Sequence, residues 1–114
     1  MLKNIPNKYI CKILLEEITN LFKGKFDFFY LPMDIDNKCN LGYAFINLLD
    51  PLHIPLFFDV FQNKRWKKYK SEKQCDLKYA RYQGKGELTS HIEKKSGLSH
   101  LSVYNSLIIS KFII

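Results

Sequence analysis

Eight consecutive residues, Leu41-Gly-Tyr-Ala-Phe-Ile-Asn-Leu48, constrain the fold of this chain more than any other segment. Side chains alternate between the two faces of an extended strand. One face of this run would carry aliphatic side chains that suit a protein core: Ala44, Ile46 and Leu48. The other would carry two aromatic rings and an amide: Tyr43, Phe45 and Asn47. The run therefore predicts a strand with aromatic rings on the face opposite the core.

The same run fits the main signature of the RNA-recognition motif, a basic residue followed by Gly-aromatic-Gly/Ala-Phe-Val-x-aromatic. Exposed rings on that strand stack against single-stranded bases. This sequence departs from the signature at Leu41, where Lys or Arg is usual, and at Leu48, where an aromatic is usual. An alternative interpretation is a strand buried on both faces, whose rings fill a core.

The size and composition of the chain indicate one globular domain. It has 114 residues, of which 46% are hydrophobic and 25% charged, enough for one core. The formal net charge is +7 and the pI about 9.3, which suits a polyanionic partner, either nucleic acid or an anionic membrane surface. Three widely spaced cysteines argue against a disulfide framework or a zinc site. We expect the protein to be in a reducing compartment inside the cell, which would be the nucleus, the cytoplasm or both.

Three further strands are expected, at Met1–Ile5, at Lys25–Leu31 and at about Cys75–Arg81. In the strand Lys25–Leu31, Asp27 is expected to face away from the core. Because side chains alternate along a strand, Phe26, Phe28 and Tyr30 would then face the core, and Phe29 and Leu31 would lie beside Asp27 on the open face. In the last strand, Leu77 and Tyr79 are expected to face inward, while Asp76, Lys78 and Ala80 face outward.

Two helices are expected between the strands. The first spans about Lys8–Phe22, with Asn7 as its cap and an apolar stripe at helical spacing. The second begins at Asp50-Pro51, a cap followed by proline at the first helical position, and ends at about Gln62. Pro55 should kink it. The segment from Asp34 to Asn40 is interpreted as a polar loop.

This order predicts an α+β, ferredoxin-like βαββαβ fold, with a four-stranded antiparallel sheet and two helices on one face. Its first and third strands lie side by side, so Lys3 and Met1 should neighbour Tyr43 and Phe45 on the uncovered face. We expect residues 1–83 to form this domain. A short C-terminal helix, Gly86 to Lys95, is expected within an extension at residues 84–95. The apolar tail at 96–114 is an added strand, an interaction segment or an artefact of the gene model.

Several runs together resemble the carboxy-terminal RNA-recognition motif of the Mei-two-like meiosis proteins. They begin with Asn4-Ile-Pro-Asn-Lys-Tyr9 and include Gly42-Tyr-Ala-Phe-Ile-Asn47 and Gln83-Gly-Lys85. Between these lie Tyr30-Leu-Pro32 with Asp34, Asn37-Lys-Cys-Asn40, Asp50-Pro51, Lys64 with Trp66, and Tyr79-Ala-Arg81. The similarity covers residues 1 to about 92. It implies an RNA-binding module that acts in the regulation of meiosis or development.

The candidate RNA-binding residues lie on the open face and just after the last strand. Tyr43 and Phe45 are expected to stack bases, and Phe29 either joins them or covers an edge against the extra helix. Phosphate or base contacts are expected from basic and amide side chains: Lys3, Lys78, Arg81, Gln83 and Lys85. The loop at residues 63–73 carries six basic residues and one acid. Lys64, Arg65, Lys67 and Lys68 are its candidate RNA contacts, whereas Trp66 is expected to be structural.

No pattern in the sequence indicates an enzyme. There is no Gly-rich phosphate loop and no Gly-x-Ser-x-Gly elbow, and the histidines and cysteines have no metal-ligand spacing. We therefore expect no catalytic residue, no metal and no cofactor.

Two functions remain open at this stage. One is a monomeric module that binds single-stranded RNA. The other is a protein-interaction variant that uses the sheet or the apolar helix face, favoured by Leu41 if it lies exposed beside Phe29 and Leu31. A membrane partner is not expected, because neither main helix pairs a broad basic face with an apolar one.

Overall fold

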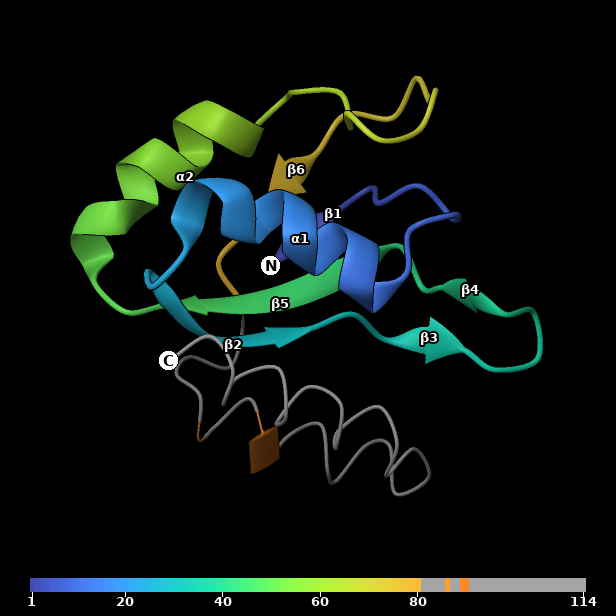
Figure 1. Cartoon of the computed structure of the whole chain (residues 1–114), viewed down its shortest axis with the longest axis horizontal. Coiled ribbons are helices and arrows are strands. Elements are labelled where there is room, and N and C mark those ends of the chain that lie inside the picture. Colours follow the sequence, from blue (N-terminus) through green and yellow to red (C-terminus); the bar gives the residue numbers. More distant parts are fainter. Residues whose placement is uncertain (81–85, 87–88, 91–114) are drawn as a thin grey trace.

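The computed structural model of this chain describes residues 1–80, 86, 89 and 90. A four-stranded antiparallel sheet has the order β2-β5-β1-β6 (Figure 1). Its strands are β1 (Leu2–Lys3), β2 (Phe26–Tyr30), β5 (Tyr43–Leu48) and β6 (Asp76–Leu77). Helices α1 (Cys11–Phe22) and α2 (Ile54–Phe61) pack with one face of the sheet into a single hydrophobic core. The predicted ferredoxin-like α+β fold is confirmed, with β1 and β5 at its centre.

Helix α1 begins three residues later than predicted. Ile10 is its N-cap residue and makes no side-chain cap bond, so Asn7 is not the cap. The chain before the helix turns instead, and the Tyr9 N–H donates to the Pro6 carbonyl at 3.1 Å. Leu14, Ile18 and Phe22 are fully buried at a spacing of four, which places them on one helix face.

The second helical segment starts as predicted and is divided in two. Asp50 Oδ1 accepts a hydrogen bond from the Leu52 N–H at 2.9 Å and caps the 3-10 turn η1 (Pro51–His53). The α-helix proper then runs from Ile54 to Phe61. Pro55 therefore lies in the first turn of α2, where its missing N–H costs no helical hydrogen bond.

The predicted side-chain parity of β2 is wrong beyond Asp27. A register shift between Phe26 and Phe28 marks a β-bulge, which reverses the side-chain alternation along the strand. Phe29 pairs with Ile46 and is fully buried in the core, so it is not on the open face. Leu31 is also a core residue. Phe28 and Tyr30 are instead paired with Asn47 and Phe45 on the uncovered face.

Strand β6 is shorter than predicted, although the Lys78 N–H still donates to the Met1 carbonyl at 3.0 Å. Leu77 faces the core as expected. Tyr79 does not, because it lies beyond the strand end with 71% of its surface exposed. Its ring lies 6.3 Å from that of Phe58, between ring centroids.

The expected polar loop contains a small hairpin of β3 (Met33–Asp34) and β4 (Cys39–Asn40). The Asp34 carboxylate closes it by accepting bonds from the Asn37 side chain at 2.7 Å and from the Asp36 N–H at 3.1 Å. Hydrogen bonds, chiefly from the Asn37 side chain, hold the pKa of Asp34 below its usual value. Within the described residues, no helix is long and apolar enough to cross a membrane.

Candidate nucleic-acid interface

The centre of the uncovered face is built from β1 and β5. Leu2 pairs with Ala44 and Lys3 with Tyr43, and directly opposed residues of antiparallel strands share a face. Because Leu2 and Ala44 are fully buried in the core, Lys3 and Tyr43 project from the other side. Phe45, two residues along β5, joins them there.

The two rings of β5 contact each other. Their centroids are 5.7 Å apart and their planes meet at 81°, an edge-to-face arrangement. Both side chains are partly exposed, and the ammonium-bearing Lys3 is exposed beside them. An accessible aromatic surface next to a cation is the combination that binds a base and its phosphate.

Strand β2 places two more aromatic residues on the same side of the sheet, an arrangement that parity alone did not predict. Phe28 and Tyr30 lie opposite Asn47 and Phe45, and both side chains are buried. Asn47 Nδ2 donates to Asp27 Oδ1 at 2.7 Å, so the acidic residue of the bulge is bound to the same face. The one feature of the sequence that could have indicated this bulge is Asp27, an acidic residue within an otherwise apolar run.

Strand β6 adds opposite charges at the edge of this face. Lys78 Nζ lies 3.9 Å from Asp76 Oδ2, and the lysine side chain is 60% exposed. Asp76 also lies directly opposite Lys3 in the register of β1 and β6. Its carboxylate is held by the Gln62 side chain, whose Nε2 donates to Oδ1 at 3.1 Å. Asp76 therefore reduces the positive potential that Lys3 and Lys78 create.

A buried asparagine fixes the position of β1 relative to β5. Asn40 Nδ2 donates to the carbonyls of Pro6 and Tyr9 at 2.8 and 3.0 Å. Its Oδ1 accepts from the Gly42 N–H at 2.7 Å, and the residue is only 4% exposed. The bonds to Pro6 and Tyr9 join the segment after β1 to the segment before β5, and the bond from Gly42 fixes the turn into β5. Together they hold Lys3 opposite Tyr43.

This geometry is accompanied by a clear family relationship. The family described as RNA recognition motif 2 matches residues 1–93. The chain belongs to this family. It is 54% identical over 96 residues to Protein MEI2-like 2 of Oryza sativa subsp. japonica and to Protein MEI2-like 1 of Arabidopsis thaliana. Each match covers 84% of this chain, but only 11% and 10% of these two relatives.

The basic loop at residues 63–73 is attached firmly to this RNA recognition motif. Trp66 Nε1 donates to the Asn4 carbonyl at 2.8 Å, and the indole is 5% exposed. The Tyr9 ring meets those of Trp66 and Tyr69 edge-on, at centroid distances of 5.6 and 4.9 Å. The structural role expected for Trp66 is confirmed by this burial.

Tyr9 itself is the centre of these contacts. Its hydroxyl donates to Glu17 Oε1 at 2.5 Å and accepts from the Lys68 N–H at 3.2 Å. Burial and the bond to Glu17 raise the pKa of the phenol above its usual range. The phenol is therefore uncharged at neutral pH and remains a donor to Glu17.

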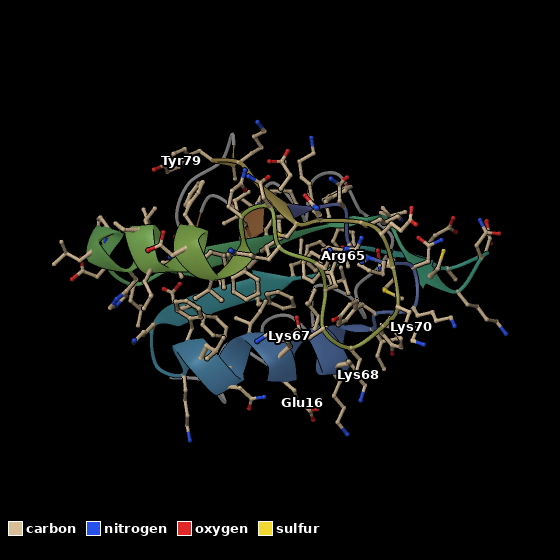
Figure 2. The ribbon with its side chains drawn as sticks, turned by 90° about the horizontal axis from the view of Figure 1, so that it is seen from above. Glu16, Arg65, Lys67, Lys68, Lys70 and Tyr79 are labelled. Carbon is tan, nitrogen blue, oxygen red and sulfur yellow. The ribbon has the colours of Figure 1, made fainter. Side chains whose placement is uncertain are left out.

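The basic loop presents several exposed cations. The side chains of Lys64, Arg65, Lys67 and Lys68 are exposed, and Figure 2 shows Lys67 and Lys68 on the side of α1, opposite Tyr79. Lys67 and Lys68 therefore lie on the helix side of the molecule rather than on the uncovered face of the sheet.

The remaining candidate positions of this RNA recognition motif lie outside the described residues. Arg81, Gln83 and Lys85 are among them, as are most of the expected helix Gly86–Lys95 and the whole tail 96–114. Gly86, Thr89 and Ser90 have helical backbone. In the described part of the chain, no three His, Cys, Asp or Glu residues are grouped to hold a metal. RNA recognition motifs are binding modules rather than enzymes.

Proposed function

We propose that this RNA-binding module binds single-stranded RNA on the uncovered face of its sheet, with bases stacked on Tyr43 and Phe45. The observation that carries the proposal is the register of β1 and β5, which sets Lys3 opposite Tyr43 on the face without helices. Family membership supports RNA as the ligand. A role in the regulation of meiosis or development is proposed only from the resemblance to the Mei-two-like meiosis proteins.

The ring geometry suggests how bases are accommodated. Because the planes of Tyr43 and Phe45 are nearly perpendicular, a base that lies parallel to one ring meets the edge of the other. Edge-to-face and offset-stacked contacts are both favourable aromatic arrangements. Lys3 and Lys78 then supply charge to phosphates on either side of the rings.

Other members of the proposed RNA surface have supporting roles. Arg81, Gln83 and Lys85 follow β6 and are proposed to contact the bound strand. The basic loop also carries candidate contacts: Lys64, Arg65, Lys67 and Lys68. Lys67 and Lys68 lie on the side of α1, so they would reach only an RNA long enough to leave the sheet. Phe29 is withdrawn from the proposed site because it is fully buried in the core.

The alternative use of the sheet as a peptide-binding surface loses its main support. It required Leu41 to be exposed beside Phe29 and Leu31. Leu41 is 49% exposed, but the other two are core residues. The apolar patch expected on the sheet is therefore not formed by these three side chains.

The test is a titration of a fluorescent mixed-sequence single-stranded RNA with the full chain and with a Tyr43→Ala, Phe45→Ala variant. Each stacking contact is worth roughly 1–3 kcal/mol, so affinity should fall between about tenfold and several thousandfold. The matched control is Leu52→Ala, Leu56→Ala, which removes two exposed apolar side chains from the α2 region. Equal binding by the two double variants would place the RNA elsewhere.

Salt dependence supplies an independent check. Each neutralised phosphate contributes about −0.7 to the slope of log affinity against log salt for single strands. Removing Lys3 and Lys78 should therefore make the slope shallower by about one to two units, whereas the ring variant should keep the parent's slope. An unchanged slope in the lysine variant would exclude phosphate contacts by these two residues.

A further inference from the structure

A groove lies on the helix side of the molecule, between α1, α2 and the basic loop. This helix-face groove has a volume of about 450 Å³, which is within the range of ligand-binding clefts. Its apolar wall includes Leu21 of α1 and Val60 and Phe61 of α2. Leu21 is 49% exposed, so the helices leave an aliphatic side chain uncovered at this site.

The rim of the groove is positively charged. Lys64, Arg65 and Lys67 line it from the loop, and the one acid in the lining is Glu17. The Glu17 carboxylate already accepts the Tyr9 hydroxyl. Among the described residues, the three cations form no ion pair. Their charge is therefore available to a ligand.

The groove is held in shape before any ligand arrives. The Cys75 N–H donates to the Lys64 carbonyl and the Asn63 N–H to the Cys75 carbonyl, both at 2.8 Å. Arg65 pairs with Gln74 in an isolated bridge. A loop that is ordered in advance loses less conformational freedom on binding.

The aromatic residues of the groove favour a peptide over RNA. Phe61 and Trp66 are only 7% and 5% exposed, so no ring face is free to stack a base. Stacking is the contact that adds affinity for unpaired bases beyond phosphate attraction. A peptide needs only an apolar side chain against Leu21 and Val60, with carboxylates near the rim.

We propose that the helix-face groove binds an acidic peptide segment of a partner protein, with one aliphatic side chain between α1 and α2 and flanking carboxylates on Lys64, Arg65 and Lys67. Figure 2 shows Arg65 and Lys67 on the loop, with Lys67 on the side of α1. This binding does not depend on the sheet, so the peptide can be bound together with an RNA short enough to stay on the sheet, whereas a longer RNA would compete with it for the loop's cations. The proposal is independent of base stacking on Tyr43 and Phe45.

The probe is a fluorescein-labelled synthetic peptide of aspartate and glutamate residues around one central leucine, and anisotropy is measured with the full chain. Arg65→Glu, Lys67→Glu should weaken binding at least about tenfold, since two attractions become repulsions. The matched control Lys12→Glu, Lys38→Glu makes the same change in net charge at exposed positions outside the groove. It should bind within about twofold of the parent.

Further arms separate the groove from general charge attraction. A peptide with serine in place of leucine should bind several-fold more weakly. The Leu21→Ser variant should bind the leucine peptide more weakly than the parent does, although its charge is unchanged. Leu21→Ser also keeps the proposal testable if the charge-reversed variant fails to fold. Circular dichroism and the fluorescence of Trp66 report folding for each variant.

Three results would overturn the proposal. One is equal binding of the leucine and serine peptides, and another is an equal loss in the matched control. The third is a loss of single-stranded RNA affinity in Arg65→Glu, Lys67→Glu with peptide affinity unchanged, which would assign the loop to RNA. Peptide binding by the Tyr43→Ala, Phe45→Ala variant should equal that of the parent chain.

Discussion

Replacing Asn40 with alanine is the most direct test of how this fold holds its candidate RNA surface. The Asn40 side chain makes three hydrogen bonds, to Pro6, Tyr9 and Gly42, and alanine makes none of them. Within the described residues, the Tyr9 carbonyl and the Gly42 N–H have no other hydrogen-bond partner. The Pro6 carbonyl keeps the bond from the Tyr9 N–H.

The expected loss of stability follows from these bonds. Each contributes about 1 kcal/mol net, and each buried group left unpaired costs about 1–3 kcal/mol. Water that enters the space left by the side chain offsets part of this cost. We expect Asn40→Ala to lower the free energy of unfolding by about 3 kcal/mol. With a urea m-value of about 1–3 kcal/mol/M, the midpoint should fall by about 1–3 M.

The assay is urea unfolding followed by the fluorescence of Trp66, the single tryptophan of the chain. Asn20→Ala is the matched control, because Asn20 is exposed on α1 and alanine is the better helix former. Its stability should be unchanged or slightly higher. A loss below about 1 kcal/mol for Asn40→Ala would refute the reasoning, since it would mean that the three bonds add nothing beyond what water supplies.

A second substitution tests the direction of the same bonds. Asn40→Asp sets a carboxylate oxygen against the carbonyls of Pro6 and Tyr9, so burial and repulsion should raise its pKa in the folded state above the usual value of about 3.9. A group with a raised folded pKa contributes stability at low pH and loses it as pH rises. Asn40→Asp should therefore gain stability relative to Asn40→Ala when the pH falls from about 7 to about 5.

Two further predictions concern charge and thiol chemistry. Asp76→Asn keeps an oxygen that can accept from Gln62 and removes the negative charge 3.9 Å from Lys78. The variant should bind single-stranded RNA about two- to threefold more tightly than the parent at low salt. Unchanged affinity would show that this carboxylate does not affect the site. Burial raises the pKa of Cys11 to about 11 and that of Cys75 to about 12, so both should stay protonated and react slowly with iodoacetamide at pH 8. Because both pKa values are raised in the folded state, the stability that these thiols contribute should be lost as the pH rises from about 9, their ordinary pKa, through about 11 and 12. Mass spectrometry that found Cys75 labelled first would contradict this.

Alternation and turn chemistry were sufficient to predict the centre of the sheet. The run around Tyr43 and Phe45 alternates cleanly between apolar core positions and the other face, so its orientation follows from a period of two. Asp50 and Pro51 likewise predict a helix start correctly, because a side-chain cap and a fixed φ act locally. These features depend on a few adjacent residues and need no knowledge of tertiary contacts.

The strand that contains Phe29 shows where such reasoning ends. Phe26 to Leu31 is nearly continuously apolar, so only Asp27 suggested which side faced the core. The bulge at Asp27 is set by pairing with β5, a strand that lies about 20 residues later and whose Asn47 binds the carboxylate. The prediction that Tyr79 faces inward is wrong for a related reason. Strand β6 ends at Leu77, so no strand orients the Tyr79 ring.

The role of Asn40 was equally hidden. Two of its partners lie 34 and 31 residues away in sequence, and an asparagine in a polar loop close to a glycine is typical of a turn. Nothing local distinguishes a turn residue from a buried bridge between two segments. The helix-face groove has the same origin, since its walls come from two helices and a loop that meet only in the folded chain.

The central position of β1 has a consequence for the order in which this domain can assemble. Strand β1 comes first among the strands of this domain, and it pairs with β5 at Tyr43 on one side and with β6 at Asp76 on the other. Synthesis proceeds from the N-terminus, so β1 can pair with β5 only after Tyr43 and Ala44 have been made, and with β6 only after Asp76 and Leu77 have been made. The hydrogen bond from Trp66 to Asn4 spans 62 residues, and contacts so distant in sequence slow folding. A nascent chain that stops before Asp76 therefore exposes one edge of β1, and the domain closes only after Leu77 has emerged.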